Sequence, residues 1–191
     1  MQKSIEKIIV DILKHELDLP DNYGKTNRGD EIPTVIIYAQ NIKLFNTDKM
    51  QITVKTVSSR NYSNRTTFKS NPNPIAEDGS DAFIEVQDIN QQRMMQVDVY
   101  SRNNEARERY WEVAAALNSV YAQQLEERYN FKIATITSDT NISGVDGGSD
   151  INRFSTTFNV LIHFQKTKTI DYYNKFPATF NNENGQFANF E

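Results

Sequence analysis

The chain begins with a pattern typical of an amphipathic helix. Apolar residues recur at helical spacing along one face, charged residues occupy the opposite face, and Ser4 can cap the N-terminus. The apolar positions are Ile5, Ile8, Ile9, Ile12, Leu13 and Leu17. Pro20 and a loop extending to Asp30 end the predicted helix. We expect this helix to bury its apolar stripe on another part of the protein.

β-branched and aromatic residues then predict strands over 34–40, 50–54, 82–86, 94–100, 131–136 and 154–164. In the strand over 94–100, apolar residues alternate with Gln96, Asp98 and Tyr100, which we expect on the outer face. The segment between the last two strands contains no helical pattern, so we expect these strands to form a long antiparallel hairpin.

A second, longer helix is predicted over 105–128, where an Ala-rich sequence carries apolar residues at the helical period. Tyr110 and Trp111 serve as core or interface anchors in this interpretation, and Arg107, Arg109 and Arg128 form part of a solvated face. The predicted fold class is therefore α+β, with an antiparallel sheet, two helices packed on one of its faces, and extended loops.

Two polar segments, 58–81 and 139–150, predict loops. Structureless loops as long as the first are uncommon inside compact domains and usually have a function. We therefore take exposed residues of both loops as candidates for contact with partners: Tyr62, Arg65, Phe68, Val145 and Asp146.

The last residues of the chain form a polar segment that carries widely spaced phenylalanines, namely Phe176, Phe180, Phe187 and Phe190. Burying four aromatic side chains does not offset the entropy lost when so many residues become ordered. We predict a single domain over 1–175 and a flexible extension over 176–191 that becomes ordered only against a partner, which makes these phenylalanines further interface candidates.

Composition excludes several classes of function. The 191 residues include no cysteine, which rules out disulfides, zinc ribbons and thiol catalysis. The 21 basic and 25 acidic residues give a net charge of −4, and no basic cluster supplies the contacts that phosphate binding needs. No apolar run is long enough to span a membrane, and the N-terminus lacks a secretory pattern, so we expect no membrane association.

The sequence offers little for catalysis. His15 and His163 are the two histidines, and neither belongs to a nucleophile motif, so we expect no enzymatic activity, cofactor or metal site. A calcium-binding loop is the alternative, because Asp139, Asn141, Ser143 and Asp150 supply oxygens at part of the required spacing and Gly144 stands at the position of the sharp turn. Asp146 stands where an apolar residue is usual, and position 12 is Asp rather than Glu. A mobile hairpin loop is favoured over a calcium-dependent binding module.

The order of these elements resembles that of the tail-terminator and neck proteins of tailed bacteriophages. An N-terminal helix and a strand pair precede the strand Met94–Tyr100, which an Asn-rich cap connects to the Ala-rich helix. A β-hairpin through 141–148 and the strand 153–164 complete the match, which loosely spans residues 1–175. The similarity centres on Gln96–Tyr100, Glu105–Arg107 and Phe158–Ile162.

The resemblance implies a structural virion protein, assembled in the host cytoplasm, which forms a ring of six copies. Such a ring ends the tail tube and joins it to the head-side neck or connector protein, and in a contractile tail it also contacts the sheath. DNA passes through the lumen without sequence-specific binding. The alternative within the same resemblance is another neck, connector or tail-completion component.

Overall fold

The computed structural model describes residues 3–37, 49–75, 81–146, 149–170, 180–181 and 187–188. Its helices are α1 (Ile5–Glu16), α2 (Glu105–Arg109), α3 (Trp111–Leu117) and α4 (Val120–Tyr129). Its strands are β1 (Asn22–Lys25), β2 (Glu31–Pro33), β3 (Val35–Ile37), β4 (Gln51–Ile75), β5 (Asp81–Ser101), β6 (Phe131–Asn141), β7 (Gly144–Asp146), β8 (Ser149–Ile170), β9 (Phe180–Asn181) and β10 (Phe187–Ala188).

The chain divides into two compact units. The first unit comprises Met1–Ser63 and Ile89–Phe164, and the second comprises Asn64–Asp88 and Gln165–Glu191. The strands β4, β5 and β8 each contribute residues to both units. The sequence-based division into a domain over 1–175 and an extension over 176–191 stays a prediction.

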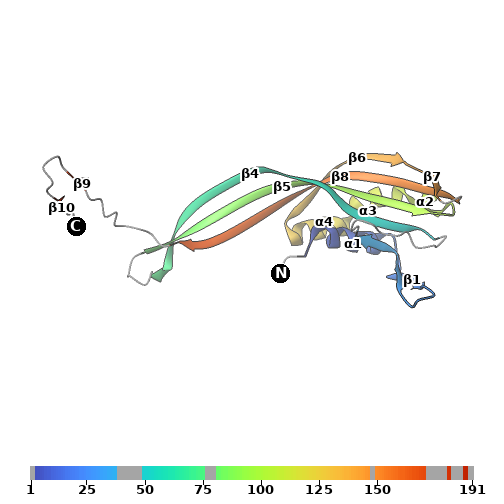
Figure 1. The fold of residues 1–191 in the computed structure, drawn as a ribbon, viewed down its shortest axis with the longest axis horizontal. Coiled ribbons are helices and arrows are strands. Elements are labelled where there is room, and N and C mark those ends of the chain that lie inside the picture. The colour runs from blue at the N-terminus through green and yellow to red at the C-terminus, as the bar shows by residue number, and fades with distance from the viewer. Residues whose placement is uncertain are drawn as a thin grey trace. The chain divides into compact units, whose positions relative to one another are not determined.

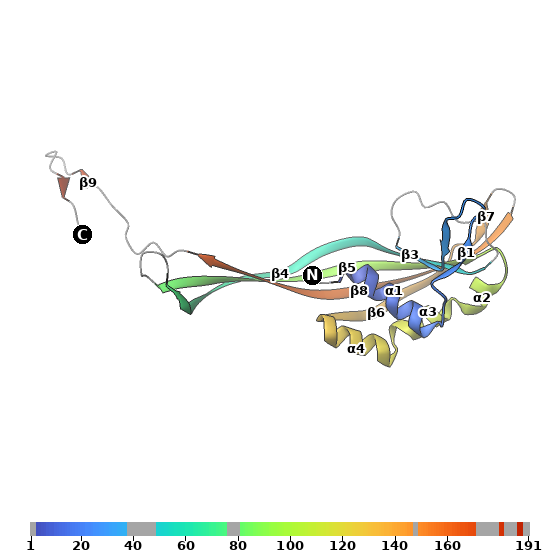
Figure 2. The same ribbon diagram turned by 90° about the horizontal axis from the view of Figure 1, so that it is seen from below.

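The main sheet has the strand order β3-β4-β5-β8-β6, and β7 pairs with β8 (Figure 1). β6 and β8 are antiparallel, with Phe131 opposite Ile162, which confirms the predicted hairpin. β3 is the exception, because it runs parallel to β4 with Val35 opposite Ile52. Within the first unit, α1, α3 and α4 lie on one face of the sheet (Figure 2). The predicted α+β class is confirmed.

α1 forms as the sequence predicts. The Ser4 side chain accepts a hydrogen bond from the backbone N–H of Lys7 at 3.4 Å, which caps the helix. All six residues of the predicted apolar stripe are buried. α1 packs against α3, α4 and β3. Removing this stripe from water is a main source of stability for the first unit.

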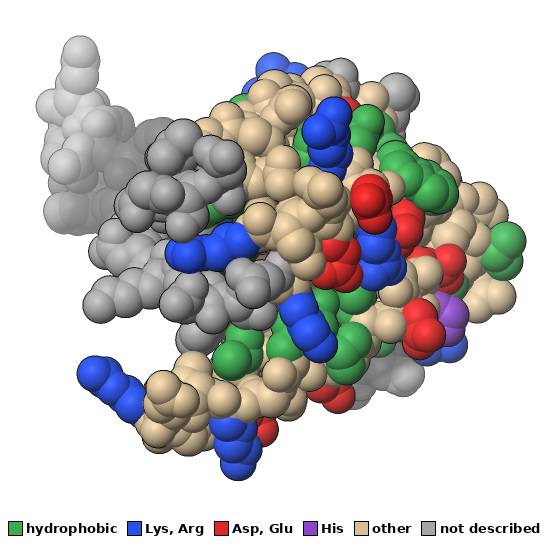
Figure 3. Space-filling model, turned by 90° about the vertical axis from the view of Figure 1, so that its right-hand side faces the viewer, with side chains coloured by type: hydrophobic (Ala, Val, Ile, Leu, Met, Phe, Trp, Pro, Cys, Tyr) green, Lys and Arg blue, Asp and Glu red, His purple; other side chains and the backbone are tan. Residues whose placement is uncertain are grey.

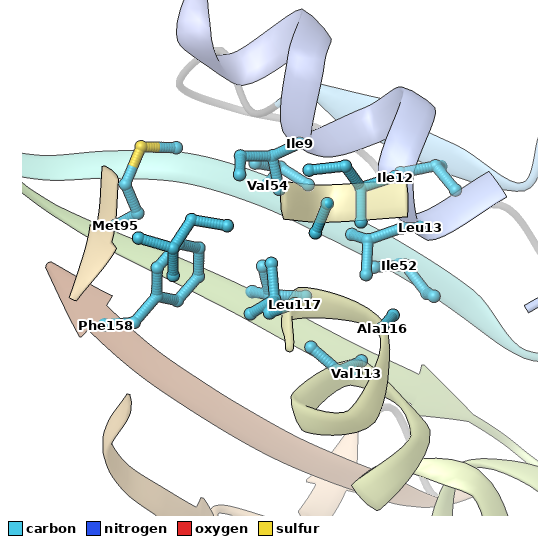
Figure 4. Packing of buried hydrophobic residues seen from close by; sticks show 14 of the residues in the cluster. Ile9, Ile12, Leu13, Ile52, Val54, Met95, Val113, Ala116, Leu117 and Phe158 are labelled. Carbon is cyan, nitrogen blue, oxygen red and sulfur yellow. The ribbon is translucent and has the colours of Figure 1, made fainter. Parts of the chain in front are cut away.

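The core of the first unit lies between the helices and one face of the sheet (Figure 4). Ile9 and Ile12 of α1 lie against Ile52 and Val54 of β4, and Phe158 of β8 lies near Met95 of β5. Phe158 is among the largest side chains that are fully buried. The alternation predicted for 154–164 is confirmed, since the core contains Phe154, Phe158, Val160 and Ile162.

The single long helix predicted over 105–128 is wrong, because the chain forms α2, α3 and α4 there instead. Asn118 leaves helical geometry, and Ser119 has an extended backbone whose side chain accepts a hydrogen bond from Ala122 N at 3.1 Å. Ser and Asn favour caps over helix interiors because their side chains bond the nearby backbone. The new cap changes the helical phase from that of a single helix, and Val120, an apolar residue of the predicted helix 105–128, is 70% exposed.

The loop predicted over 58–81 is also wrong, since β4 continues to Ile75 and β5 begins at Asp81. Residues 76–80 lie outside the described residues. The polar residues belong to a strand whose two faces are in contact with water. The sequence therefore contains no alternation of apolar and polar residues that would predict a strand here. Pro72 and Pro74 lie two residues apart near the end of β4, so their missing N–H donors fall on the same edge.

Two other predicted loops contain strands. The segment 139–150 includes the end of β6, all of β7 and the start of β8, with Val145 paired to Asp150. The loop from Pro20 to Asp30 contains β1, which forms an antiparallel hairpin with β2. Gly29, in the turn of that hairpin, has a φ of 88°, a conformation that favours glycine.

The second unit contains the ends of β4 and β8 and the beginning of β5. Gln165 of β8 donates a hydrogen bond to Asp88 of β5 at 2.9 Å, and Val86 of β5 is buried. Burial of a residue on β5 fits its position between two neighbouring strands. β9 and β10 pair with each other, with Phe187 opposite Asn181.

Candidate functional site

One part of β4 is exposed to an unusual degree. Every residue from Thr56 to Thr66 is exposed, and so are Phe68 and Lys69, with Thr67 half-buried between them. We refer to residues 56–69 as the exposed segment of β4. Successive residues of a strand point to opposite faces of the sheet, so both faces of this segment are in contact with water.

The exposed segment also has an open edge. β3 pairs with β4 at Ile52, Thr53 and Val54, and among the described residues no strand pairs with the outer edge of β4 beyond that point. The outer edge of β8 is similar: in the described part of the chain, its pairing with β6 ends at Ile162, and β8 continues beyond that residue. Unpaired strand edges present backbone donors and acceptors to other chains.

Side chains hold the inner edge of the exposed segment to β5. Asn61 accepts a hydrogen bond from Gln91 at 3.0 Å, and Arg60 donates one to Gln92 at 3.5 Å. The partner numbers fall along β5 as they rise along β4, which is the pattern of an antiparallel pair. The segment is therefore ordered by one neighbouring strand without being covered by a second layer.

The structure places the interface residues predicted from the sequence in different elements. Tyr62, in the first unit, is 51% exposed, and Phe68, in the second, is 63% exposed; Arg65 is exposed as well. Val145 and Asp146 lie in β7, and Phe180 and Phe187 lie in β9 and β10. The predictions for Phe176 and Phe190 fall outside the described residues.

A buried ionic network on β5 was missed by the sequence analysis. Asp98, predicted to face outward, is only 3% exposed. It accepts hydrogen bonds from Arg153 Nη2 and Gln96 Nε2, both at 2.7 Å, and Lys55 Nζ lies 3.7 Å from it. Burial raises the pKa of this carboxyl, but hydrogen bonds from Arg153, Gln96 and Ser155 outweigh that effect and the pKa is lowered. The network joins β4, β5 and β8.

Polar residues on neighbouring positions are buried too. Tyr100, also predicted to face outward, is buried, and so are Gln51 and Thr53 of the predicted strand 50–54. Both faces of the sheet are therefore buried here. Within the described part of the chain, Tyr100 Oη and Gln51 Oε1 have no hydrogen-bond partner. Burial raises the pKa of the Tyr100 phenol.

Arg109 is a structural centre rather than part of a solvated face, which corrects the prediction for this residue. It donates hydrogen bonds to Glu112 at 2.7 Å and to the backbone oxygen of Leu17 at 3.1 Å, and it pairs with Glu105 at 3.4 Å. Its pKa is raised, chiefly by the hydrogen bond to Glu112. Glu105 in turn accepts a hydrogen bond from Met50 N at 2.9 Å. These contacts tie α2 and α3 to the end of α1 and the start of β4.

The two predicted aromatic anchors of this region differ. The Tyr110 ring stacks on Phe154 with 4.4 Å between ring centroids, so it packs against the core. Trp111 is 57% exposed, and its indole N–H donates to the backbone oxygen of Glu108 at 2.8 Å. Of the two alternatives that the sequence left open for Trp111, the core position is wrong.

The histidines occupy different settings. The ring of His15 stacks on Tyr121 at 3.9 Å between centroids, and His163 Nδ1 lies 2.9 Å from Asn90 Oδ1. Both therefore make structural contacts.

The candidate calcium ligands also lie in a structural setting. Asp139 and Asn141 are paired in the ladder of β6 and β8, and Asn141 Oδ1 accepts hydrogen bonds from the backbone N–H and hydroxyl of Ser143. Among the residues that the structure describes, no group of three acidic or histidine side chains could hold a metal ion.

Basic and acidic side chains are interspersed on the face of the molecule seen in Figure 3, with hydrophobic ones between them. That face therefore lacks the single-sign field that steers a polyanion. No helix in the described ranges has both the length and the apolar character needed to cross a membrane. No protein-family model matches the chain, and no curated protein matches it.

Proposed function

We propose that this protein is a structural component of a tailed-phage virion that forms a ring, ends the tail tube and joins it to the head-side neck protein. The exposed segment of β4 carries the proposal. A strand whose edge and two faces are uncovered by the described residues of its own copy offers that surface to another chain. Tyr62 and Phe68 add exposed aromatic area of the kind enriched in protein interfaces.

A ring follows when one surface of each copy contacts a different surface of the next. Head-to-tail contacts of this kind close into a ring if the rotation between copies completes a circle. The segment of β4 supplies one such surface, and the order of elements that resembles tail terminators favours a ring of six. We place the ring in the virion, with the tail tube on one side and the neck or connector on the other.

DNA passes through this ring without being read. The net charge of −4 limits retention of a polyanion, because few phosphate contacts form without clustered basic residues. A role in assembly also accounts for the chemistry of the described residues, where both histidines are engaged in structural contacts.

Mass photometry and electron microscopy of the purified protein, alone and mixed with tail tubes, test the proposal. We expect a ring that caps tube ends. A protein that stays monomeric even beside tail tubes would contradict the proposal. Co-sedimentation with headless tails supports a terminator, whereas binding only to tailless heads identifies a head-side connector instead.

A matched pair of variants tests the role of the exposed segment. Phe68→Ala should reduce the fraction of rings, since it removes exposed aromatic area from β4. Val120→Ala, which alters an exposed apolar residue on α4, is the control and should leave the ring fraction unchanged. If Phe68→Ala and Val120→Ala reduce the fraction of rings equally, the exposed segment is not part of the interface.

A further inference from the structure

The first unit contains a small cavity of about 160 Å³ beside the start of α1. Its apolar lining comes from α1, from the end of α4 and from β6 and β8: Ile5, Ile8, Tyr129, Phe131, Ile162 and Phe164. We call this the α1 pocket. Apolar cavities of roughly 150 Å³ hold a benzene-sized molecule. The α1 pocket therefore has the volume and the lining to take one phenyl ring.

Two cations share this lining. Lys3 pairs with Asp11, and Arg93 Nη1 lies 3.7 Å from Glu6, while the Arg93 guanidinium lies 5.9 Å from the centre of the Phe164 ring. No carboxylate is among the described residues that line the pocket. Arg93 Nε also donates a hydrogen bond to Gln91 at 2.6 Å. An ammonium has three donor hydrogens and a guanidinium five, so each cation can bond a further acceptor beside its present partners. The pocket thus suits an aromatic ring followed closely by an acid.

One segment of the sequence has this chemistry. Residues 176–191 contain four phenylalanines, two glutamates and no lysine or arginine. Of the four phenylalanines, only Phe190 is followed directly by an acidic residue, Glu191. Fully extended, these residues span roughly 50 Å, which is enough to reach a neighbouring protein.

We infer that the α1 pocket of one copy binds Phe190 of a neighbouring copy, with the Glu191 carboxylate beside Lys3 and Arg93. The inference rests on the proposed ring, which supplies the neighbouring copy. It deepens that proposal, because it assigns a docking place to a segment that the sequence predicts to become ordered only against a partner. Each copy would then both give and receive a segment, as a head-to-tail ring requires.

Cysteine cross-linking tests the inference cleanly, since the natural chain has no cysteine. One full-length variant carries Ser4→Cys at the pocket, and a second carries Asn189→Cys, which leaves Phe190 and Glu191 intact. After the two are mixed and mildly oxidised, we expect the Ser4–Asn189 disulfide to form at least about tenfold faster than a Val120–Asn189 control disulfide, because docking raises the effective concentration. Mass spectrometry of the separated dimers identifies the bond.

Two further variants test whether the cross-link depends on the Phe190 ring and on the charge of Arg93. Phe190→Ala in the Asn189→Cys chain should reduce the rate to that of the control. Arg93→Gln in the Ser4→Cys chain should slow the reaction and weaken its dependence on salt, because screening acts on the charge contact. A Ser4–Asn189 rate equal to the control rate would overturn the inference.

A chain that carries both Ser4→Cys and Asn189→Cys, diluted into excess natural protein, shows whether the Phe190 in the pocket comes from the same copy or from a neighbouring one. Rapid closure within one chain would identify the donor as the chain's own segment and overturn the inference. Rings that form without the pocket cross-link would refute the docking and leave the proposed function standing. Monomers beside tail tubes would refute the proposed function itself.

Discussion

Two stretches of the same strand, β4, have opposite environments. From Gln51 to Val54 every side chain is buried, because both faces of the sheet are covered there. From Thr56 to Thr66 every side chain is exposed. Both stretches belong to one strand that pairs with β5, although among the described residues only the first also pairs with β3, so an extended backbone alone says little about how much a stretch contributes to stability. The difference shows where the fold gains free energy from burial and where surface is left for partners.

The largest expected effect is in the buried part of the sheet. Phe158→Ala removes a fully buried ring and should lower the free energy of unfolding by about 3–5 kcal/mol, from lost burial and the cavity left behind. Urea denaturation followed by circular dichroism measures this change.

Phe68→Ala provides the matching control in the exposed segment. It should change the free energy of unfolding by less than about 0.5 kcal/mol, as surface substitutions usually do. A loss comparable to that of Phe158→Ala would show that the two regions do not differ as described.

A smaller effect is expected at Asp98, a buried carboxylate on the neighbouring strand β5. Asp98→Asn should lower the free energy of unfolding at pH 7 by about 1.5 kcal/mol, because it weakens the hydrogen bond from Arg153, whose guanidinium is 43% exposed and stays solvated. The pKa of Asp98 is lowered on folding, so its contribution is present above its usual value of 3.8 and is lost as the pH falls through the lower folded pKa. The difference between the two proteins should therefore shrink as the pH drops below about 4.

Asp21→Asn is the exposed counterpart. Asp21 also pairs with a cation, Lys14, and its pKa is lowered by that hydrogen bond, but it is exposed. The substitution should leave the stability curve nearly unchanged, since solvent and salt screen surface pairs. Equal pH profiles for the two variants would contradict a special role for the buried network.

Among the buried positions, the smallest effect is expected at Tyr100. Its buried hydroxyl has no hydrogen-bond partner within the described residues, so Tyr100→Phe removes an uncompensated polar group. The free energy of unfolding should rise by up to about 1 kcal/mol or stay unchanged. Thermal denaturation measures it, with Tyr62→Phe as the exposed control. A clear loss of stability would mean that the hydroxyl does have a partner.

The sequence predicted the elements that bury one face. The stripe of α1 and the alternation over 154–164 are visible because a buried face requires apolar residues at a fixed period. The exposed segment of β4 gave no such signal, since neither of its faces is buried. Asp98 and Tyr100 were misplaced for the opposite reason, because a buried polar face looks like a solvated one in the sequence.

In the candidate site, too, the sequence predicted some features and missed others. Tyr62, Arg65 and Phe68 are exposed, but they lie in a strand where the sequence predicts a loop. The sequence contains a signal for the break between α3 and α4, because Asn118 and Ser119 favour a helix cap. The helical spacing of apolar residues continues past Ser119, however, and that pattern predicts one helix.

By itself, the sequence determined the class of fold, the amphipathic helix, the β6–β8 hairpin and the absence of cysteine chemistry. Local propensity and the period of apolar residues carry that information. Only the tertiary structure decided which polar residues are buried, which strand edges stay open and where the α1 pocket forms. Those features depend on which segments come together in space, and side chains distant in the chain create them only after the sheet has assembled.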